Sequence, residues 1–451
     1  MGRLFGTDGV RGVVNETLTS ELAMSIGRAL CSVLSPSGKY RPLVLIGTDT
    51  RRSCHMLMSA LGAGVCSAGG DVINLGVIPT PAVAFLVKKY GAGAGVVISA
   101  SHNSYEYGGI KIFSSEGFKL DDGLEEKIES IVRGRSPAPS LEKPGKIGRF
   151  LDTPPVISDY TEYIKSFCDT SLSGLRVGID CANGAAYKSA KRIFPSLGCE
   201  CFFIGDGPDG VNINDKCGST HLDALRKLVK SENLDVGIAF DGDADRCLAL
   251  DSEGNEVDGD FIMAILADEL LKRGKLRGNA VVGTVMTNLG FVNFCEERGI
   301  NFVAARVGDR YVLELMRLDG LSFGGEQSGH IIFGDYSTTG DGQLTAVALL
   351  ATLKKSGKSL TELASLMNKY PQFTHNVDAD TDEKVIFLSD REIAEEIKRA
   401  EAKLGDGRII VRPSGTEPYI RVMAEGEDRE SAEQAAKQTA LFIRKRLDSY
   451  K

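Results

Sequence analysis

Short apolar runs alternate with amphipathic stretches along most of this 451-residue chain. Residues 20–34 place their apolar side chains on one stripe at helical spacing, and residues 43–47 form an apolar run that is typical of a buried strand. A second helix is predicted at 53–68, where a Gly pair ends it, and a second strand follows at 71–75. This order predicts α/β domains with mostly parallel sheets and helices on both faces.

Four units can be distinguished along the chain. The first, residues 1–150, closes with a Pro-rich, linker-like segment. The same theme of helices and strands then recurs in residues 151–252 and 253–368, without a repeat of the sequence itself. Residues 369–451 differ because their strands alternate with charged amphipathic helices, so we expect a smaller α+β unit there.

A hydroxyl group stands where one of the buried strands ends. The apolar run 96–98 leads into Ser101 and His102, and Lys111 follows a little further along. Sheets of α/β proteins carry their chemistry at the carboxyl ends of strands, and a hydroxyl with an imidazole and an amine nearby indicates a nucleophile or a phosphate carrier. An isolated Ser-His pair more often caps a turn and packs, so this motif needs support from the rest of the chain.

Three aspartates follow another apolar strand, in the sequence IAFDGDADR at residues 238–246. Asp241, Asp243 and Asp245 alternate with small residues, so their carboxylates converge if the backbone curls there. Three hard oxygen ligands without His or Cys beside them favour Mg²⁺ over zinc. A solvated acidic turn or a weak Ca²⁺ loop is the alternative, although the spacing lacks the distal Glu of the EF-hand calcium loop.

A glycine-flanked cluster, GGEQSGH, stands at residues 324–330. Its side chains Glu326, Ser328 and His330 offer a carboxylate, a hydroxyl and an imidazole on a loop that a ligand can approach closely. This combination suits the recognition of sugar hydroxyls.

The sequence RPSGTEPYIR, at residues 412–421, has the composition of a phosphate-binding turn. Backbone N–H groups around a glycine form a nest of donors, and arginines add bidentate hydrogen bonds. The members of this phosphate cradle are Arg412, Ser414, Gly415, Thr416 and Arg421. Gly-rich polar turns are common, so the cradle alone would be weak evidence; together with the other three motifs it indicates phosphoryl transfer.

In this order and spacing, the four motifs resemble those of the α-D-phosphohexomutase superfamily over the whole chain. The amino-terminal sequence RLFGTDGVRG and the GEQSGH motif resemble the branch that acts on glucosamine phosphate more than the mannose and glucose branches. The resemblance implies an α/β fold of four domains around a central cleft: three similar αβα sandwich domains with mixed sheets, and a smaller C-terminal α+β lid domain. One motif falls in each of them: the phosphoserine loop in 1–150, the Mg²⁺-binding loop in 151–252, the sugar-binding loop in 253–368 and the phosphate-binding lid in 369–451.

The resemblance also implies a role for each motif. Ser101 would carry a phosphate in the resting enzyme, and the three aspartates would bind Mg²⁺ together with that phosphate. Glu326 and Ser328 would contact the sugar. The non-reacting phosphate would be held by Arg412, Ser414, Gly415, Thr416 and Arg421.

The attacking hydroxyl needs a base that takes its proton. Lys111 and His330 are the candidates, with His102 behind them. A surface lysine on a strand is the alternative for Lys111, and the resemblance favours the acid/base role. Arg11, in a Gly-flanked turn, and Arg246, beside the aspartates, are expected to offset the charge of the travelling phosphate, with a surface salt bridge as the alternative for Arg11.

One position departs from the pattern of the family. Ser104 stands where the family usually has the Pro of Ser-His-Asn-Pro. Proline would fix its φ at about −65° and bias the preceding Asn103 toward an extended conformation. We therefore expect a looser loop after Ser101 and a lower rate, with activity retained.

The expected activity is the reversible conversion of glucosamine 6-phosphate to glucosamine 1-phosphate, through a phosphoserine and a 1,6-bisphosphate intermediate. The resemblance implies that this reaction feeds UDP-N-acetylglucosamine and cell-wall synthesis. Phosphomannomutase or phosphoglucomutase activity is the nearest alternative. A non-catalytic phosphosugar-binding regulator and a Mg²⁺-dependent phosphatase are alternatives of other classes.

Composition limits the remaining possibilities. The formal net charge of −8 and the lack of a Lys/Arg run argue against a nucleic-acid partner. Residues 1–12 are polar and Gly-rich, unlike a signal peptide, and no apolar run approaches the ~20 residues of a membrane helix, so no membrane partner is expected. The 10 cysteines are scattered without a C-x-x-C pair, which indicates reduced thiols and a cytoplasmic location. The expected partners are small-molecule hexosamine phosphates and their 1,6-bisphosphate, with the protein a monomer or a homodimer.

Overall fold

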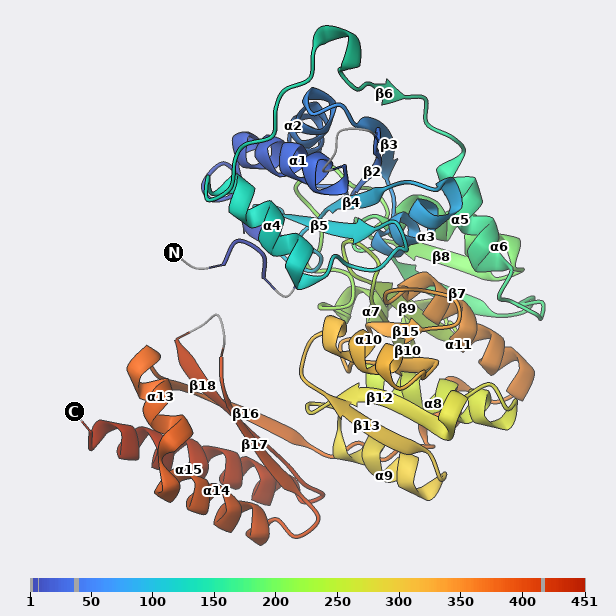
Figure 1. Ribbon diagram of the computed structural model, residues 1–451. Coiled ribbons are helices and arrows are strands. Elements are labelled where there is room, and N and C mark those ends of the chain that lie inside the picture. The colour runs from blue at the N-terminus through green and yellow to red at the C-terminus, as the bar shows by residue number, and fades with distance from the viewer. Residues whose placement is uncertain (1–2, 7, 36–39, 415–417, 451) are drawn as a thin grey trace. The chain divides into compact units, whose positions relative to one another are not determined.

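The computed structural model describes residues 3–6, 8–35, 40–414 and 418–450. The chain divides into two compact units (Figure 1). Unit 1 comprises Met1–Met286 and Gly299–Leu366, and unit 2 comprises Thr287–Arg298 and Met367–Lys451. Among the described residues, three sheets belong to unit 1 and one belongs to unit 2.

A six-stranded mixed sheet forms the amino-terminal part of unit 1, in the order β1-β5-β4-β2-β3-β6. β2 pairs in parallel with β3 and β4, whereas β5 runs antiparallel to both β1 and β4. The strands are β1 (Val10–Val13), β2 (Leu43–Thr48), β3 (Asp71–Val77), β4 (Ala94–Ile98), β5 (Tyr107–Ser114) and β6 (Phe150–Leu151).

Helices cover both faces of this sheet (Figure 1). Val44 and Ile46 of β2 pack in one core cluster with residues of α1, α2 and α4. Gly47 faces the other way, because side chains alternate along a strand, and a Cβ there would lie 2.5 Å from Val83 of α3. The helices are α1 (Ser20–Leu34), α2 (Cys54–Ser67), α3 (Thr80–Tyr90) and α4 (Asp122–Val132). The helices and strands predicted between residues 20 and 75 are thereby confirmed.

Two further mixed sheets complete unit 1, in the orders β11-β10-β9-β7-β8 and β13-β12-β14-β15. Both sheets are mixed. β7 pairs in parallel with β9, and β12 with β13, whereas β10 runs antiparallel to β9, and β15 to β14. The strands are β7 (Arg176–Asp180), β8 (Glu200–Ile204), β9 (Val236–Phe240), β10 (Cys247–Asp251), β11 (Glu256–Val257), β12 (Ala280–Thr284), β13 (Asn301–Ala305), β14 (Phe323–Gly325) and β15 (Ile331–Phe333). The helices are α5 (Val156–Lys165), α6 (Ala186–Ser196), α7 (Asp223–Ser231), α8 (Gly259–Lys272), α10 (Asp309–Leu318), α11 (Gly342–Ser356) and α12 (Leu360–Ala364).

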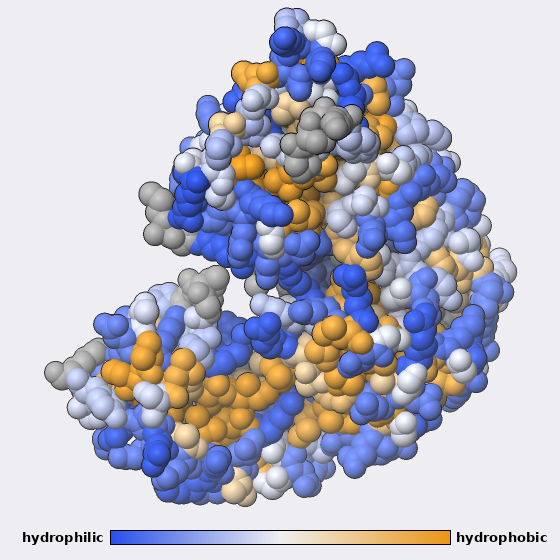
Figure 2. Space-filling view, viewed as in Figure 1, coloured by the Kyte–Doolittle hydropathy of each residue, from blue (hydrophilic) through white to orange (hydrophobic). Residues whose placement is uncertain are grey.

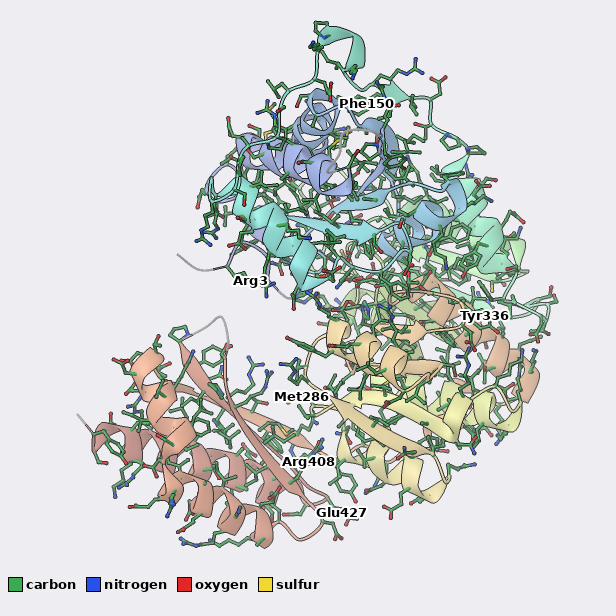
Figure 3. All side chains as sticks on the ribbon, in the orientation of Figure 1. Arg3, Phe150, Met286, Tyr336, Arg408 and Glu427 are labelled. Atoms are coloured by element: carbon green, nitrogen blue, oxygen red, sulfur yellow. The ribbon has the colours of Figure 1, made fainter. Side chains whose placement is uncertain are left out.

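Unit 2 is built on an antiparallel three-stranded sheet in the order β16-β18-β17. Ile420 and Val422 of β18 pack in the core with Ile443 of α15. Arg408 of β17, labelled in Figure 3, pairs with the carboxylate of Glu425, which is fully buried. The elements are α9 (Leu289–Glu297), β16 (Gln372–Asp378), α13 (Thr381–Ser389), α14 (Arg391–Lys403), β17 (Arg408–Pro413), β18 (Tyr419–Glu425) and α15 (Arg429–Asp448).

One helix of unit 2, α13, does not follow the usual pattern of an amphipathic helix. Asp380 and Glu383 form a capping box at its start. Phe387 is buried, but Val385 and Leu388 are 62% and 70% exposed, so the apolar residues do not share one face. Figure 2 shows a broad apolar area on the viewed face of unit 2.

The mixed α/β sheets of unit 1 and the α+β character of unit 2 confirm the predicted fold class. The boundaries at residues 150, 252 and 368 stay predictions. Within the described part of the chain, no helix is both long enough and apolar enough to cross a lipid bilayer.

Candidate active site

Ser101 lies just beyond the carboxyl end of β4 and is almost completely buried. Its Oγ donates a hydrogen bond to Oδ2 of Asp241, at 2.7 Å, and lies 3.4 Å from Nδ1 of His102. A glycine is required at position 109 of β5, because a Cβ there would lie 2.3 Å from the carbonyl oxygen of Ser99. The close approach of β5 therefore helps to place the serine.

The three aspartates follow β9 and are buried together. One oxygen of each of the carboxylates of Asp241, Asp243 and Asp245 lies within 4.8 Å of the others. Ala244 has a φ of 58°, which supplies the expected curl of the backbone. The Oδ1 atoms of Asp243 and Asp245 are buried and make no hydrogen bond to any described residue. Buried anionic oxygens without donors are suited to bind a cation.

The aspartates also affect one another's ionisation. Burial, with the negative charges of Asp245 and Asp243, raises the pKa of Asp241 well above its ordinary value. A divalent cation would relieve this repulsion, and an all-oxygen ligand set fits Mg²⁺. The residues therefore fit the predicted metal, and a solvated acidic turn is excluded by their burial.

Lys111, on β5, is buried with the aspartates, so it is not the surface lysine that the sequence left open. Its Nζ lies 2.9 Å from Oδ2 of Asp243, 3.0 Å from Oδ2 of Asp8 and 3.5 Å from Oδ2 of Asp245. Burial alone would lower the pKa of Lys111, but the charges of these carboxylates outweigh it and raise the pKa well above its ordinary value. Lys111 is therefore an ammonium at neutral pH.

His330 is buried between two carboxylates. Nδ1 lies 3.6 Å from Oδ2 of Asp245, and Nε2 lies 3.5 Å from Oδ2 of Asp309. Their charges outweigh burial and raise the pKa of His330 to about 9. The amide of Gly340 donates to Nε2 at 2.9 Å, so the proton of the neutral ring faces Asp245.

The pKa of His102 is shifted in the opposite direction to that of His330. Burial lowers its pKa to about 4, and the charges of Arg246 and Arg11 act in the same direction. At neutral pH its imidazole is therefore uncharged beside Ser101.

Three residues without an assigned catalytic role extend this charge network: Asp8, Lys119 and Asp309. Nζ of Lys119 lies 2.6 Å from Oδ1 of Asp8 and 2.5 Å from Oδ2 of Asp309. Because Asp8 also pairs with Lys111 and Asp309 also faces His330, alternating charges connect the two candidate acid/base residues. The sequence carries no signal for this network, since Lys119 and Asp309 stand 190 positions apart.

Two arginines border the carboxylates. Arg11 donates to Oδ2 of Asp8, the oxygen that also faces Nζ of Lys111, so this ion pair is joined to the buried charges of the site. The backbone N–H of Arg246 donates to Oδ1 of Asp241 at 3.2 Å, and its Nε lies 4.0 Å from Oδ1 of Asp245. The Nε atoms of both arginines are buried without a hydrogen-bond partner among the described residues.

The GEQSGH motif is the turn between the antiparallel strands β14 and β15. Oε1 of Glu326 accepts a hydrogen bond from the amide of Gly308 at 3.0 Å, and burial raises the pKa of Glu326. Oγ of Ser328 is buried and has no partner among the described residues. A carboxylate and an unsatisfied hydroxyl on one tight turn can serve as contacts to a polyol.

The phosphate cradle belongs to unit 2, where its described residues lie at the end of β17 and at the start of β18. Arg412 and Arg421 are direct partners across the two strands, and Nη2 of Arg421 donates to the hydroxyl of Tyr419 at 2.8 Å. Burial, and then the charge of Arg421, lowers the pKa of Arg412. Like charges opposite each other are unfavourable, so this pair suits a bound anion. Ser414 donates its amide to Tyr419, whereas Gly415 and Thr416 lie outside the described residues.

Four family models match the chain, and all describe parts of phosphoglucomutase/phosphomannomutase. They are alpha/beta/alpha domain I at residues 2–138, domain II at 158–254, domain III at 258–370 and the C-terminal domain at 375–441.

Curated relatives resemble the chain over its full length. The phosphoglucosamine mutase of Clostridium novyi is 51% identical over 453 residues, which cover 100% of both chains. That of Acetivibrio thermocellus is 52% identical over 448 residues, which cover 99% of this chain and 100% of the relative.

Solved structures share the fold. A phosphoglucomutase/phosphomannomutase family protein from Burkholderia thailandensis superposes with a TM-score of 0.82 and 25% identity, over 99% of this chain and 97% of the other. The N-acetylphosphoglucosamine mutase of Aspergillus fumigatus, solved in complex with GlcNAc-6P and magnesium, gives a TM-score of 0.71 at 18% identity, over 98% and 95% of the two chains.

We predict that Lys119→Met destabilises the protein in a pH-dependent way. Lys119 and other cations outweigh burial and hold the pKa values of Asp8 and Asp309 below their ordinary values. The stability from these carboxylates is therefore present at neutral pH and is lost as the pH falls through their titration. Urea unfolding should show a loss of about 3 kcal/mol near pH 7, and this loss should become smaller as the pH falls below about 4, the ordinary pKa of the unfolded carboxyl groups.

Lys127→Met is the control, because Lys127 is exposed on α4. It should leave the free energy of unfolding within about 0.5 kcal/mol of the wild type. A loss for Lys119→Met that is equal at pH 7 and at about pH 3 would contradict the assigned ion pairs.

Proposed function

The chain belongs to the phosphoglucosamine mutase family of phosphohexomutases, and from this membership we propose that it interconverts glucosamine 6-phosphate and glucosamine 1-phosphate. The predicted family and isomerase class are confirmed by relatives about half identical over the full length. The roles of individual residues remain proposals, and the geometry of unit 1 supports them as follows.

Ser101 is the proposed carrier of the phosphoryl group. The observation that carries this assignment is the contact of Ser101 Oγ with Asp241, 2.7 Å away, inside a buried cluster of carboxylates. A hydroxyl held against metal-binding oxygens is well placed to present a phosphate to the same cation. The phosphoryl group leaves Ser101 Oγ for a free sugar hydroxyl, which yields the 1,6-bisphosphate, and the other phosphoryl group of that intermediate returns to the serine.

The three aspartates are the proposed holders of Mg²⁺, with the phosphate on Ser101 as a further ligand. When bound, Mg²⁺ would offset the negative charge that spreads over the phosphoryl oxygens during transfer. Arg246 and Arg11 border the same carboxylates and can contribute to this neutralisation.

We assign the residues that donate and accept protons from their charge at neutral pH and from their position in the site. Lys111 is an ammonium and can donate a proton to the serine oxygen when its bond to phosphorus breaks. His330 accepts the amide of Gly340 at Nε2 and faces Asp245 through Nδ1, so both ring nitrogens are engaged and we assign it a role in orienting Asp245. His102 is neutral beside Ser101 and can accept the proton of the attacking hydroxyl. The sequence placed His102 behind Lys111 and His330 as a candidate for the base. We now place His102 first for that role.

Substrate contacts are proposed for the turn that carries the GEQSGH motif and for the phosphate cradle. Glu326 and Ser328 would bind sugar hydroxyls, and Arg412, Ser414 and Arg421 would bind the non-reacting phosphate. A cavity of about 730 Å³ beside His330 and Asp309 offers space for a polar ligand near the turn. Its lining includes charges of both signs: Arg3, Lys119, Arg306, Arg310 and Arg317, with Asp121, Asp122, Asp309 and Glu314.

The sugar preference can be measured directly. Initial rates on the 1-phosphates of glucosamine, glucose and mannose, at equal concentration and with the matching 1,6-bisphosphate present, should be highest for glucosamine. A faster rate on mannose or glucose phosphate would contradict the proposed substrate. Release of inorganic phosphate in place of the isomer would instead indicate a phosphatase.

We predict that Ser101→Ala lowers mutase activity by a factor on the order of 10³ or more, because loss of the group that forms the covalent intermediate removes the pathway itself. Intact-mass analysis of the wild type should find one phosphate, which peptide mapping places on Ser101. Ser158→Ala, at an exposed serine of α5, is the control and should retain full activity. Near-normal turnover by Ser101→Ala would refute the carrier role.

We predict that Asp243→Asn weakens the affinity for Mg²⁺ by at least about tenfold, since one anionic ligand is lost. Isothermal titration calorimetry with Mg²⁺ measures this directly, and an excess of chelator should abolish wild-type activity. Asp319→Asn, at an exposed aspartate after α10, serves as the control. Equal Mg²⁺ affinity in the wild type and Asp243→Asn would argue against the ligand role.

A further inference from the structure

We propose that Arg51, together with Asn214, is a positioning residue for the phosphoserine loop, defined here as residues 101–104. The proposal rests on the proposed function, because it concerns the loop whose serine would carry the phosphoryl group. Arg51 follows β2, and Asn214 lies between β8 and α7, so they reach the loop from different parts of unit 1.

The guanidinium group of Arg51 binds the carbonyl groups of the phosphoserine loop. The side chain of Arg51 is fully buried. Nη2 donates to the carbonyl oxygens of Ser101 and Asn103, each at 2.9 Å, and Nη1 donates to that of Ser104. Three carbonyls therefore converge on one planar fork of donors, a geometry that the compact ammonium of a lysine cannot reproduce.

Asn214 supplies a second donor to the same carbonyls. Its Nδ2 donates to the oxygens of Ser101 and Asn103, again at 2.9 Å each. The carbonyl oxygen of Ser101 thus accepts two hydrogen bonds from two residues that are far apart in the sequence. Without such donors, these buried carbonyl groups would lower the stability of the folded protein.

The amide of Ser101 is tied to the same arginine through two side chains. Nε of Arg51 donates to Oδ2 of Asp49 at 2.9 Å. Oγ of Ser99 donates a hydrogen bond to that same oxygen at 2.6 Å. The same Oγ accepts a hydrogen bond from the amide of Ser101 at 2.9 Å. Asp49 and Arg51 together therefore fix both the N–H and the C=O of the serine.

These contacts hold the serine in a backbone conformation that it would not adopt freely. The φ of Ser101 is +52°, in the left-handed region that residues with a Cβ rarely occupy. Gly242 packs against it so closely that a Cβ there would lie 2.5 Å from the carbonyl oxygen of Ser101. The direction of Oγ toward Asp241 depends on this backbone conformation.

The consequence for the reaction is precision of transfer. The serine oxygen must give up and take back a phosphoryl group at one place, and a displacement of about 1 Å can cost about a hundredfold in rate. Ser104, which the sequence predicted to loosen the loop, has its carbonyl bound by Arg51. The hydrogen bonds of Arg51 can therefore supply the stiffness that a proline ring would otherwise provide.

Two variants test this role. Arg51→Lys keeps a positive charge but removes the fork, and Asn214→Asp keeps the shape but replaces the donor with an acceptor. For the conversion of glucosamine 1-phosphate, we expect kcat to fall by at least about tenfold while KM stays within about twofold. This split is expected because the sugar-binding contacts are untouched.

Three comparisons make the result decisive. Arg52→Lys changes the exposed neighbouring arginine and should keep full kcat. Leu61→Ala removes a buried side chain of α2 and should lower the melting temperature without lowering kcat of the folded enzyme. A kcat loss in the two test variants no larger than in Leu61→Ala overturns the positioning role. Ser101→Ala is assayed in parallel, and activity in that variant would overturn the proposed function itself, so the two failures are distinguishable.

Discussion

The buried negative charge of Asp241, Asp243 and Asp245 is the constraint on which the rest of unit 1 depends. Carboxylates this close repel one another, and water cannot screen them inside the protein. Two buried groups offset this charge: the ammonium of Lys111 and Nδ1 of His330, which carries the ring proton, both face Asp245. Two carboxylate oxygens remain without a hydrogen-bond donor among the described residues, which is where a divalent cation fits.

Neutralisation of this charge extends well beyond the aspartates. Lys111 shares Asp8 with Lys119, and Lys119 shares Asp309 with His330. The ion pairs therefore join the amino-terminal turn, strand β5 and the start of α10 into one electrostatic unit. Groups that are paired on several sides have little freedom to move, so the site is organised before a sugar phosphate arrives. The serine is held by a separate system of neutral and charged hydrogen bonds to its backbone.

Local chemistry was readable from the sequence, whereas contacts over long sequence separations were not. The strand that ends before Ser101 and the curl that gathers the aspartates follow from short apolar runs and small residues, and both are confirmed. Lys119 and Arg51 each look like an ordinary surface charge in the sequence, since the contacts of Arg51 with Ser101 and of Lys119 with Asp309 span 50 and 190 positions. Helix α13 escaped prediction because its apolar residues do not share one face. The roles of Gly415 and Thr416 stay predictions, because both lie outside the described residues.

The most direct test of the central claim is to follow the phosphoryl group itself. Dephosphorylated protein would be mixed with Mg²⁺ and glucosamine 1,6-bisphosphate that carries radiolabelled phosphate, and quenched in acid. The account predicts one labelled phosphate per chain on the peptide that contains Ser101, and its transfer to unlabelled glucosamine 6-phosphate in a chase that requires the metal. Label on another residue, or label on Ser101 that the sugar phosphate cannot remove, would contradict it.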